Sequence, residues 1–134
     1  MKMIGLDTNV VIRLLTDDDP RQRRAALKLA DGLGRDYLAF LPLVAVLELN
    51  WALWAKLGFS RQDTVRAIES LLRTRGLVVE HHDLVVKALR LVLTENADFA
   101  DALIAARSLQ EGCAAIKTFD RKAASRVPGM ELLA

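Results

Sequence analysis

Acidic residues stand at four places in the sequence where an enzyme could use them. The first place is Ile4-Gly5-Leu6-Asp7-Thr8-Asn9-Val10, in which an apolar run stops at Asp7 and a helical pattern begins at once. This pattern predicts a buried strand over Met3–Leu6 and a helix over Asn9–Leu15, with Asp7 in the turn between them. Open α/β sheets hold their chemistry at this end of a strand. Asp7 is also a residue type expected to cap the helix behind it.

Glu48 is the only ionisable residue between Leu38 and Ala55. Because the predicted helix around it is apolar on nearly every face, we expect its carboxylate to be buried. A buried carboxylate without a partner is costly and tends to become protonated. It therefore needs an arginine, a hydrogen-bond network or a cation. An ion pair that serves only the structure is one open interpretation.

Three further aspartates lie towards the carboxyl end of the chain. Asp98 and Asp101 are spaced i and i+3, so they are neighbours on a helical surface. They fall in the predicted first turn, where the helix dipole favours negative charge, which gives one of them a structural explanation. Asp120 follows the predicted strand Ala114–Thr118 much as Asp7 follows the first strand, and it could also cap the next helix.

All of these acids can reach one crevice if the strands are parallel. Helices in α/β layers run antiparallel to the strands, so helix amino termini lie at the edge that holds the carboxyl ends of the strands. Clustered carboxylates repel each other, and the hard cations Mg²⁺ and Mn²⁺, which prefer oxygen ligands, would neutralise them. Such ions activate water and stabilise a leaving oxygen in phosphoryl chemistry. Metal-assisted phosphoryl chemistry is therefore the predicted activity.

The elements that position these acids alternate between strand and helix. Further strands are predicted at Tyr37–Leu41, Leu77–Val79, Ala114–Thr118 and Met130–Leu133. Further helices are predicted after Asp19-Pro20 and at roughly Leu43–Lys56, Arg61–Arg73, Leu84–Thr94, Asp98–Gln110 and Asp120–Ser125. Such alternation implies parallel pairing through crossover connections. We predict an α/β fold, a three-layer α/β/α sandwich around a mostly parallel sheet of about four or five strands.

Length and composition favour one globular domain over residues 1–134. The chain is 52% apolar and 27% charged, and its net charge of +2 is too small to name a partner. A single cysteine, Cys113, excludes an internal disulfide and suits a reduced, cytoplasmic compartment. Pro42 and Glu48 interrupt the apolar stretch Leu38–Ala55, so we expect a strand followed by a helix and no membrane segment.

The acidic stretches, taken in order, resemble the motifs of a PIN domain. The matching residues are Leu6-Asp7-Thr8-Asn9, an acid in the next strand–helix unit, Asp101-Ala-Leu-Ile-Ala-Ala and Thr118-Phe119-Asp120. They look in particular like the VapC type, the toxin of bacterial toxin–antitoxin pairs, from about Ile4 to Ala124. The resemblance implies that the catalytic, metal-binding acids are Asp7, Glu48, Asp101 and Asp120. It implies that the supporting residues are Thr8, Asn9, Asp98 and Thr118.

The same resemblance implies a Mg²⁺-dependent endoribonuclease, with Mn²⁺ as the alternative ion, that hydrolyses RNA with metal-activated water. Candidate phosphate contacts for the RNA are Arg13, Arg121 and Lys122. The alternatives are a housekeeping RNA-processing PIN nuclease and a degenerate PIN domain that binds RNA or protein without catalysis. All four acids are present, which argues against the degenerate form.

Two partners besides RNA follow from the resemblance, a small cognate antitoxin and a second copy of the chain in a homodimer. The candidate dimer surfaces are the helix around Leu43–Leu57, with Trp51 and Trp54, and the helix Arg61–Arg73. Such tryptophans are more often core or interface residues than a base-stacking platform. An antitoxin segment is expected beside the first helix, with an arginine directed towards Asp7 and Asp101. The apolar residues expected on that helix are Val10, Val11, Leu14 and Leu15.

Overall fold

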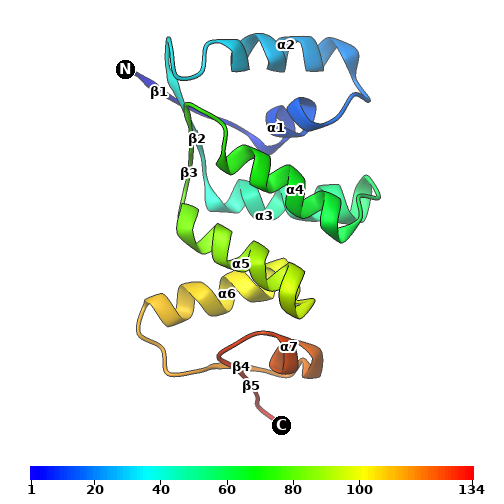
Figure 1. The fold of residues 1–134 in the computed structure, drawn as a ribbon, viewed down its shortest axis with the longest axis vertical. Coiled ribbons are helices and arrows are strands. Elements are labelled where there is room, and N and C mark those ends of the chain that lie inside the picture. The colour runs from blue at the N-terminus through cyan, green and yellow to red at the C-terminus, as the bar shows by residue number, and fades with distance from the viewer. The chain divides into compact units, whose positions relative to one another are not determined.

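The computed structural model describes all 134 residues, and the chain divides into two compact units, Met1–His82 and Asp83–Ala134 (Figure 1). The first unit contains β1 (Met3–Gly5), α1 (Thr8–Leu15), α2 (Pro20–Asp31), β2 (Leu38–Leu41), α3 (Leu43–Trp51), the π-helical turn η1 (Ala52–Lys56), α4 (Arg61–Leu72) and β3 (Leu77–Val79). Helix α5 (His82–Glu95) begins at the boundary. The second unit continues with α6 (Phe99–Gln110), β4 (Ile116–Thr118), α7 (Arg121–Arg126) and β5 (Met130–Leu132).

The first unit is organised around a parallel three-stranded sheet in the order β1, β2, β3. Met3 lies opposite Leu38, and β2 pairs with β3 in the same direction. The pairing continues past β1, because the Leu6 amide donates to the Phe40 carbonyl at 3.0 Å. This hydrogen bond fixes the backbone directly before Asp7, so the turn that carries the first acid is anchored to the sheet.

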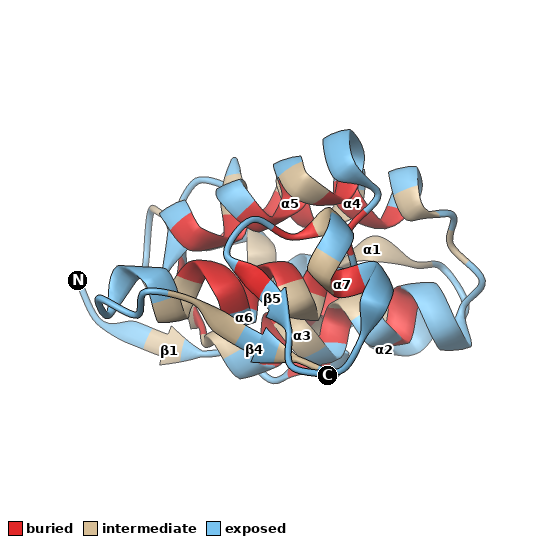
Figure 2. Cartoon of the chain, turned by 90° about the horizontal axis from the view of Figure 1, so that it is seen from below, coloured by how far each residue is buried: buried red, intermediate tan, exposed pale blue.

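Aliphatic side chains from this sheet and its helices form the core of the first unit. Helix α1 contacts both α2 and α3, and α3 contacts α4. Figure 2 shows the buried residues as stripes along the helices, while the opposite helix faces are exposed. Such stripes are the usual pattern of amphipathic helices on a core. The largest side chains of this unit that are almost fully buried are Val11, Leu41, Val46, Leu49, Leu53 and Ile68.

In the second unit, two strands pair with each other and a short helix connects them along the chain. Strands β4 and β5 are parallel, with Ile116 opposite Met130, and α7 connects them and contacts both. Ala123 and Val127 are buried at this helix. Every strand pair in the chain is therefore parallel, which confirms the predicted α/β fold. The strands form one three-stranded and one two-stranded sheet. The single domain over residues 1–134 and the three-layer arrangement stay predictions.

The predicted elements are all present, with ends displaced by a few residues. The largest difference is in the helix predicted to run to Lys56, because α3 ends at Trp51 and continues as η1. Pro42 separates β2 from α3 within the apolar stretch at residues 38–55, as expected. No helix is both long and apolar enough to cross a membrane.

Candidate functional site

Asp7 and Glu48 are connected through Thr8, at the start of α1. Asp7 is the amino-terminal cap of α1, and its Oδ1 accepts a hydrogen bond from the Thr8 amide at 2.7 Å. Thr8 is only 9% exposed, and its hydroxyl donates to Glu48 Oε1 at 2.8 Å. Thr8 therefore holds both acids, Asp7 through its backbone and Glu48 through its side chain.

Glu48 is exposed, so the prediction of a buried carboxylate was wrong. Helix α3 buries Ala45, Val46 and Leu49, while Val44 on its other side is 68% exposed. The helix is apolar nearly all round, but only one of its faces is covered by the rest of the unit. Glu48 takes part in no ion pair, and its hydrogen-bond partner is the hydroxyl of Thr8. Of the three partners considered for it, a hydrogen bond is the one observed.

The two amino-terminal acids (Asp7 and Glu48) line one hollow, which we call the acid pocket. It has a volume of about 250 Å³. Helix α1 contributes one wall, and α3 with η1 contributes the other. Short π-helical turns often occur at functional sites in proteins. The residues that line the pocket are Asp7, Thr8, Asn9, Ile12, Glu48, Trp51, Ala52 and Lys56.

The carboxyl-terminal acids (Asp98, Asp101 and Asp120) belong to the second unit. Asp98 caps α6 and accepts from the Asp101 amide at 3.0 Å. Asp120 caps α7 and accepts from the amides of Lys122 and Ala123. Burial, and then the negative charges of Asp98 and Asp120, raise the pKa of Asp101. Asp98 and Asp120 are therefore close enough for their charges to act on the Asp101 carboxylate.

The capping interpretation of Asp7 and Asp120 is confirmed, and Asp98 is also found to cap its helix, but capping leaves part of each carboxylate unused. Each cap accepts its hydrogen bonds through a single oxygen, Oδ1 of Asp7, Oδ2 of Asp98 and Oδ1 of Asp120. None of the amino-terminal or carboxyl-terminal acids takes part in an ion pair with lysine, arginine or histidine.

These carboxylates are a donor set that suits a hard divalent cation, because Mg²⁺ and Mn²⁺ prefer oxygen ligands. These carboxylates have free oxygens and no cationic partners, and the pKa of Asp101 is raised. All three observations indicate negative charge that the protein does not neutralise. No three histidine, cysteine, aspartate or glutamate side chains are gathered closely enough to hold a metal ion. The acids fall into two groups, with Asp7 and Glu48 in the first unit and Asp98, Asp101 and Asp120 in the second.

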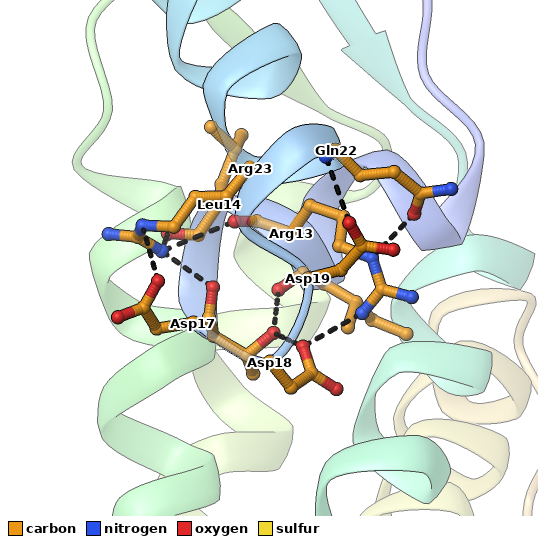
Figure 3. Close-up of polar contacts among 9 residues, drawn as sticks. Arg13, Leu14, Asp17, Asp18, Asp19, Gln22 and Arg23 are labelled. Carbon is orange, nitrogen blue, oxygen red and sulfur yellow. Dashed lines mark hydrogen bonds and ion pairs between the residues drawn. The ribbon is translucent and has the colours of Figure 1, made fainter.

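The predicted supporting and RNA-binding residues differ in whether hydrogen bonds or ion pairs fix their side chains. The Thr118 hydroxyl accepts a hydrogen bond from the Asp120 amide at 3.0 Å, which fixes the turn before α7. Arg121 and Lys122 are exposed at the start of α7. Arg13, in contrast, is held by Asp18 at 2.9 Å and by a hydrogen bond to Gln22 at 2.7 Å (Figure 3).

Both tryptophans are exposed, so neither is a core residue. Trp51 is 56% exposed and Trp54 is 50% exposed. Sequence reasoning did not place Trp51 or Lys56 at the site, although both line the acid pocket. The available indication was the spacing of Glu48 and Trp51, because residues three apart share one side of a helix.

A protein family and a solved structure are similar to the chain. A family model described as PIN domain matches residues 4–129. No curated protein matches the chain. One similar solved structure is a toxin–antitoxin complex from Klebsiella pneumoniae, with 20% sequence identity, coverage of 96% of this chain and 95% of that chain, and a TM-score of 0.37. Because the family model takes in nearly the whole sequence, the chain belongs to the PIN domain family.

Proposed function

We propose that this protein is a Mg²⁺-dependent endoribonuclease and the toxin of a VapBC-type toxin–antitoxin pair. The observation that carries the proposal is the PIN domain match over residues 4–129, because PIN domains are generally nucleases. The carboxylates without cationic partners support it further. The resemblance of the acidic motifs to the VapC type supports the narrower role as a toxin. The proposed location is the cytoplasm, which suits an exposed free cysteine at position 113.

In this proposal the two groups of acids contribute to one metal centre, as the family resemblance implies. Asp7, Asp101 and Asp120 hold the principal Mg²⁺, for which Mn²⁺ can substitute. When bound, the cation supplies an activated water and stabilises the leaving oxygen of the phosphodiester. Glu48, oriented by the Thr8 hydroxyl, completes the site or orients that water.

Capping and metal binding are compatible at these residues. The helix caps orient Asp7 and Asp120 through one oxygen each and leave the other oxygen for a ligand. Arg121 and Lys122 are the proposed phosphate contacts, because both are exposed beside Asp120. Arg13 stays a weaker candidate, since Asp18 and Gln22 already hold its guanidinium group.

The test of catalysis compares wild-type protein with Asp7→Asn and with Asp63→Asn on single-stranded RNA. Asp63 is a matched control, an exposed acid in the first turn of α4 with Arg66 at 3.8 Å. Removing even a residue that supports a metal ligand costs about 10- to 100-fold in activity, so Asp7→Asn should lose at least about 100-fold. Asp63→Asn should cleave normally, and a chelator should stop cleavage. Unchanged cleavage by purified Asp7→Asn would refute the assignment.

The proposed partner is a small antitoxin that places an apolar segment along α1 and an arginine towards Asp7 and Asp101. An arginine suits this task, because its planar fork pairs with carboxylates through two hydrogen bonds and stays charged. A hollow of about 330 Å³ between α1 and α2 supports the docking of such a segment. Val10 lines this hollow, whereas Val11 is fully buried and is not available to a partner, contrary to expectation.

The toxin role is tested in bacteria. Expression of the wild-type protein should arrest growth, and co-expression of a small neighbouring reading frame should relieve the arrest. Equal harmlessness of the wild-type protein and Asp7→Asn would exclude the toxin role. The protein would then be a housekeeping RNA-processing nuclease or a non-catalytic binding module. The cleavage test separates those two functions.

We further propose that the protein is a homodimer. Apolar side chains around α3 and η1 remain exposed, with Val44 at 68%, Trp54 at 50% and Leu57 at 39%. Covering them with a second copy would remove apolar surface from water. Light scattering at tens of micromolar protein should give the mass of a dimer, and the mass of a monomer would contradict the proposal.

A further inference from the structure

The two tryptophans of the chain have similar exposure but different surroundings. Trp51 lines the acid pocket together with Asp7 and Glu48, and Trp54 does not. More than half of the surface of Trp51 is exposed, and its indole N–H donates no hydrogen bond within the protein. A large aromatic side chain at the edge of a pocket, with so little of it covered, contributes little to the core. Its position gives it contact with whatever enters the pocket.

The π-helical turn places a cation against this ring. Lys56 Nζ lies 4.7 Å from the centre of the Trp51 ring. Residues five apart do not face each other on an α-helix, where the neighbours are three and four apart. In η1 the hydrogen bond spans five residues, as from the Leu57 amide to the Ala52 carbonyl at 2.9 Å. The turn therefore brings residues 51 and 56 onto the same side of the helix.

An aromatic face beside a lysine is the combination that single-stranded nucleic acids require. Every base has a flat face that can stack on an aromatic ring, and each nucleotide carries a phosphate that a cation can contact. Within the pocket, the carboxylates of Asp7 and Glu48 would repel a phosphate, whereas Lys56 would attract one. A base on Trp51 and a phosphate on Lys56 would attach the RNA at the edge of the pocket. The acids would then remain available to bind the proposed Mg²⁺.

We propose that Trp51 and Lys56 form a nucleotide subsite for single-stranded RNA, in which one base stacks on the Trp51 indole and Lys56 contacts the adjacent phosphate. This inference rests on the proposed nuclease function and names two residues that would hold the RNA strand beside the acids. Trp51 is a positioning residue that holds the strand, and it has no part in the hydrolysis. Duplex RNA does not fit the subsite, because its bases are already stacked on their neighbours.

Intrinsic fluorescence tests the stacking directly, since the chain contains only these two tryptophans. Trp54→Phe leaves Trp51 as the sole indole, and Trp51→Phe leaves Trp54. Both are made in an Asp120→Asn background, which blocks cleavage without touching the acid pocket. A short single-stranded RNA of mixed sequence should quench the protein that retains Trp51 and leave the protein that retains Trp54 unchanged. Quenching of equal size by inorganic polyphosphate would overturn base stacking, because polyphosphate has no bases.

Cleavage kinetics test the contribution to RNA binding in the otherwise native protein. Trp51→Ala should raise KM for single-stranded RNA by about 5- to 150-fold with a smaller change in kcat, as expected for the loss of one stacked base. Trp51→Phe should recover most of this loss, because it restores an aromatic face. Trp54→Phe is the matched control, because it keeps an apolar ring on the proposed dimer surface, and it should keep the wild-type KM, even though Arg61 lies 5.4 Å from the Trp54 ring.

The outcomes separate this subsite from the proposed catalysis. Normal cleavage with no quenching and no effect of Trp51→Ala overturns the subsite and leaves the nuclease intact. Quenching of Trp51 by RNA in a protein that never cleaves RNA supports the subsite and overturns the catalytic proposal. Absence of both quenching and cleavage overturns both. A change of mass in light scattering for Trp51→Ala would assign Trp51 to a subunit interface and overturn the subsite.

Discussion

Helix capping and metal binding compete for a carboxylate only if both need the same oxygen. Asp7, Asp98 and Asp120 each cap a helix through one oxygen, so a structural and a chemical role can coexist. Asp101 differs, because it sits in the first turn of α6 and its carboxylate caps nothing. Its charge is the least compensated of the group, and it is therefore the best residue for testing whether these acids repel each other.

Asp101→Asn should change how stability depends on pH in the absence of divalent cations. The pKa of Asp101 is raised above its ordinary value of 3.8, so the folded state holds that proton more tightly than the unfolded state does. This contribution to stability is fully present below pH 3.8 and is lost as pH rises through the folded pKa. Urea unfolding should find Asp101→Asn more stable than wild type near pH 7, by less than about 1 kcal/mol because solvent screens the charges.

The stability difference between the two proteins should disappear at a pH well below 3.8, where Asp101 is protonated in both states. Asp63→Asn serves as the comparison, since Asp63 lies 3.8 Å from Arg66 instead of beside other acids. That variant should gain no stability at neutral pH. A loss of stability for Asp101→Asn at pH 7 would show that the carboxylate makes a favourable structural contact.

Thr8→Val should separate the orientation of Glu48 from the stability of the fold. The substitution keeps the buried volume at position 8 and removes the hydroxyl that donates to Glu48 Oε1. Groups that orient metal ligands typically contribute about 10- to 100-fold, so RNA cleavage should fall by about that factor and require more Mg²⁺. The free energy of unfolding should change by about 1 kcal/mol or less, because the exposed Glu48 can accept from water instead.

Thr64→Val is the matched control for this change. Thr64 is 3% exposed, and its hydroxyl donates to the Ser60 carbonyl at 2.8 Å within the same unit. The variant removes a comparable hydrogen bond at a distance from the acids, so cleavage should stay at the wild-type level. Equal loss of cleavage in both variants would attribute the effect of Thr8→Val to general destabilisation.

The sequence predicted the positions of the acids better than their environments. Residue type and spacing placed Asp7, Asp98 and Asp120 at helix starts, because capping depends on local chemistry. The burial of Glu48 could not be predicted in the same way. Burial depends on which helix face other elements cover, and an apolar pattern around the whole helix does not indicate that face. The resemblance implied a supporting role for Thr8 but did not indicate which acid its hydroxyl contacts, since that partner lies 40 positions away in the sequence.

Helix α1 depends on α2 for its carboxyl end. Arg23 Nη1, from α2, lies 3.2 Å from the carbonyls of Arg13 and Leu14 and 2.7 Å from that of Thr16 (Figure 3). These carbonyls lie where a helix leaves its backbone acceptors unsatisfied, and a positive charge there also favours the helix dipole. Arg23 therefore stabilises the helix whose other end carries Asp7.

Arg23→Met should destabilise the protein by about 1.5–3 kcal/mol, the range found for hydrogen bonds to charged groups. Methionine keeps much of the aliphatic stem, so the loss reports mainly the missing hydrogen bonds. Arg24→Met is the matched control, since Arg24 is exposed on the same helix and should change stability by no more than about 0.5 kcal/mol. Thermal and urea unfolding of the two variants measure the difference, and similar stabilities would argue against a cap by Arg23.

The π-helical turn is the element that the sequence did not predict. The continuous apolar pattern predicted a single helix up to Lys56. Hydrophobic periodicity does not reveal where hydrogen bonds between residues four apart give way to hydrogen bonds between residues five apart. The change has a structural consequence, since it places Lys56 over Trp51. The other helix and strand ends differ from prediction only at their caps, where local residue preferences leave an uncertainty of about 2–4 residues.

At the scale of the molecule, the alternation of strands and helices was enough to predict parallel pairing. It was not enough to predict that the strands divide into two sheets. All strand pairs are parallel, as the crossover rule requires. Their division into a three-stranded and a two-stranded sheet depends on contacts between distant parts of the chain. Strands of three or four residues carry too little pattern to specify those contacts. The PIN domain match over residues 4–129 includes residues of both compact units.

Divalent metal should stabilise the whole protein, because a ligand that binds only the folded state shifts the unfolding equilibrium. Mg²⁺ at about 100 times its Kd should add about 2.7 kcal/mol and raise Tm by on the order of 10 °C. Asp101→Asn, which lacks a proposed ligand charge, should show a clearly smaller rise, while Asp63→Asn should match wild type. Differential scanning fluorimetry with and without Mg²⁺ measures all three proteins. Equal rises in wild type and Asp101→Asn would mean that the ion binds elsewhere and that the repulsion around Asp101 serves no metal site.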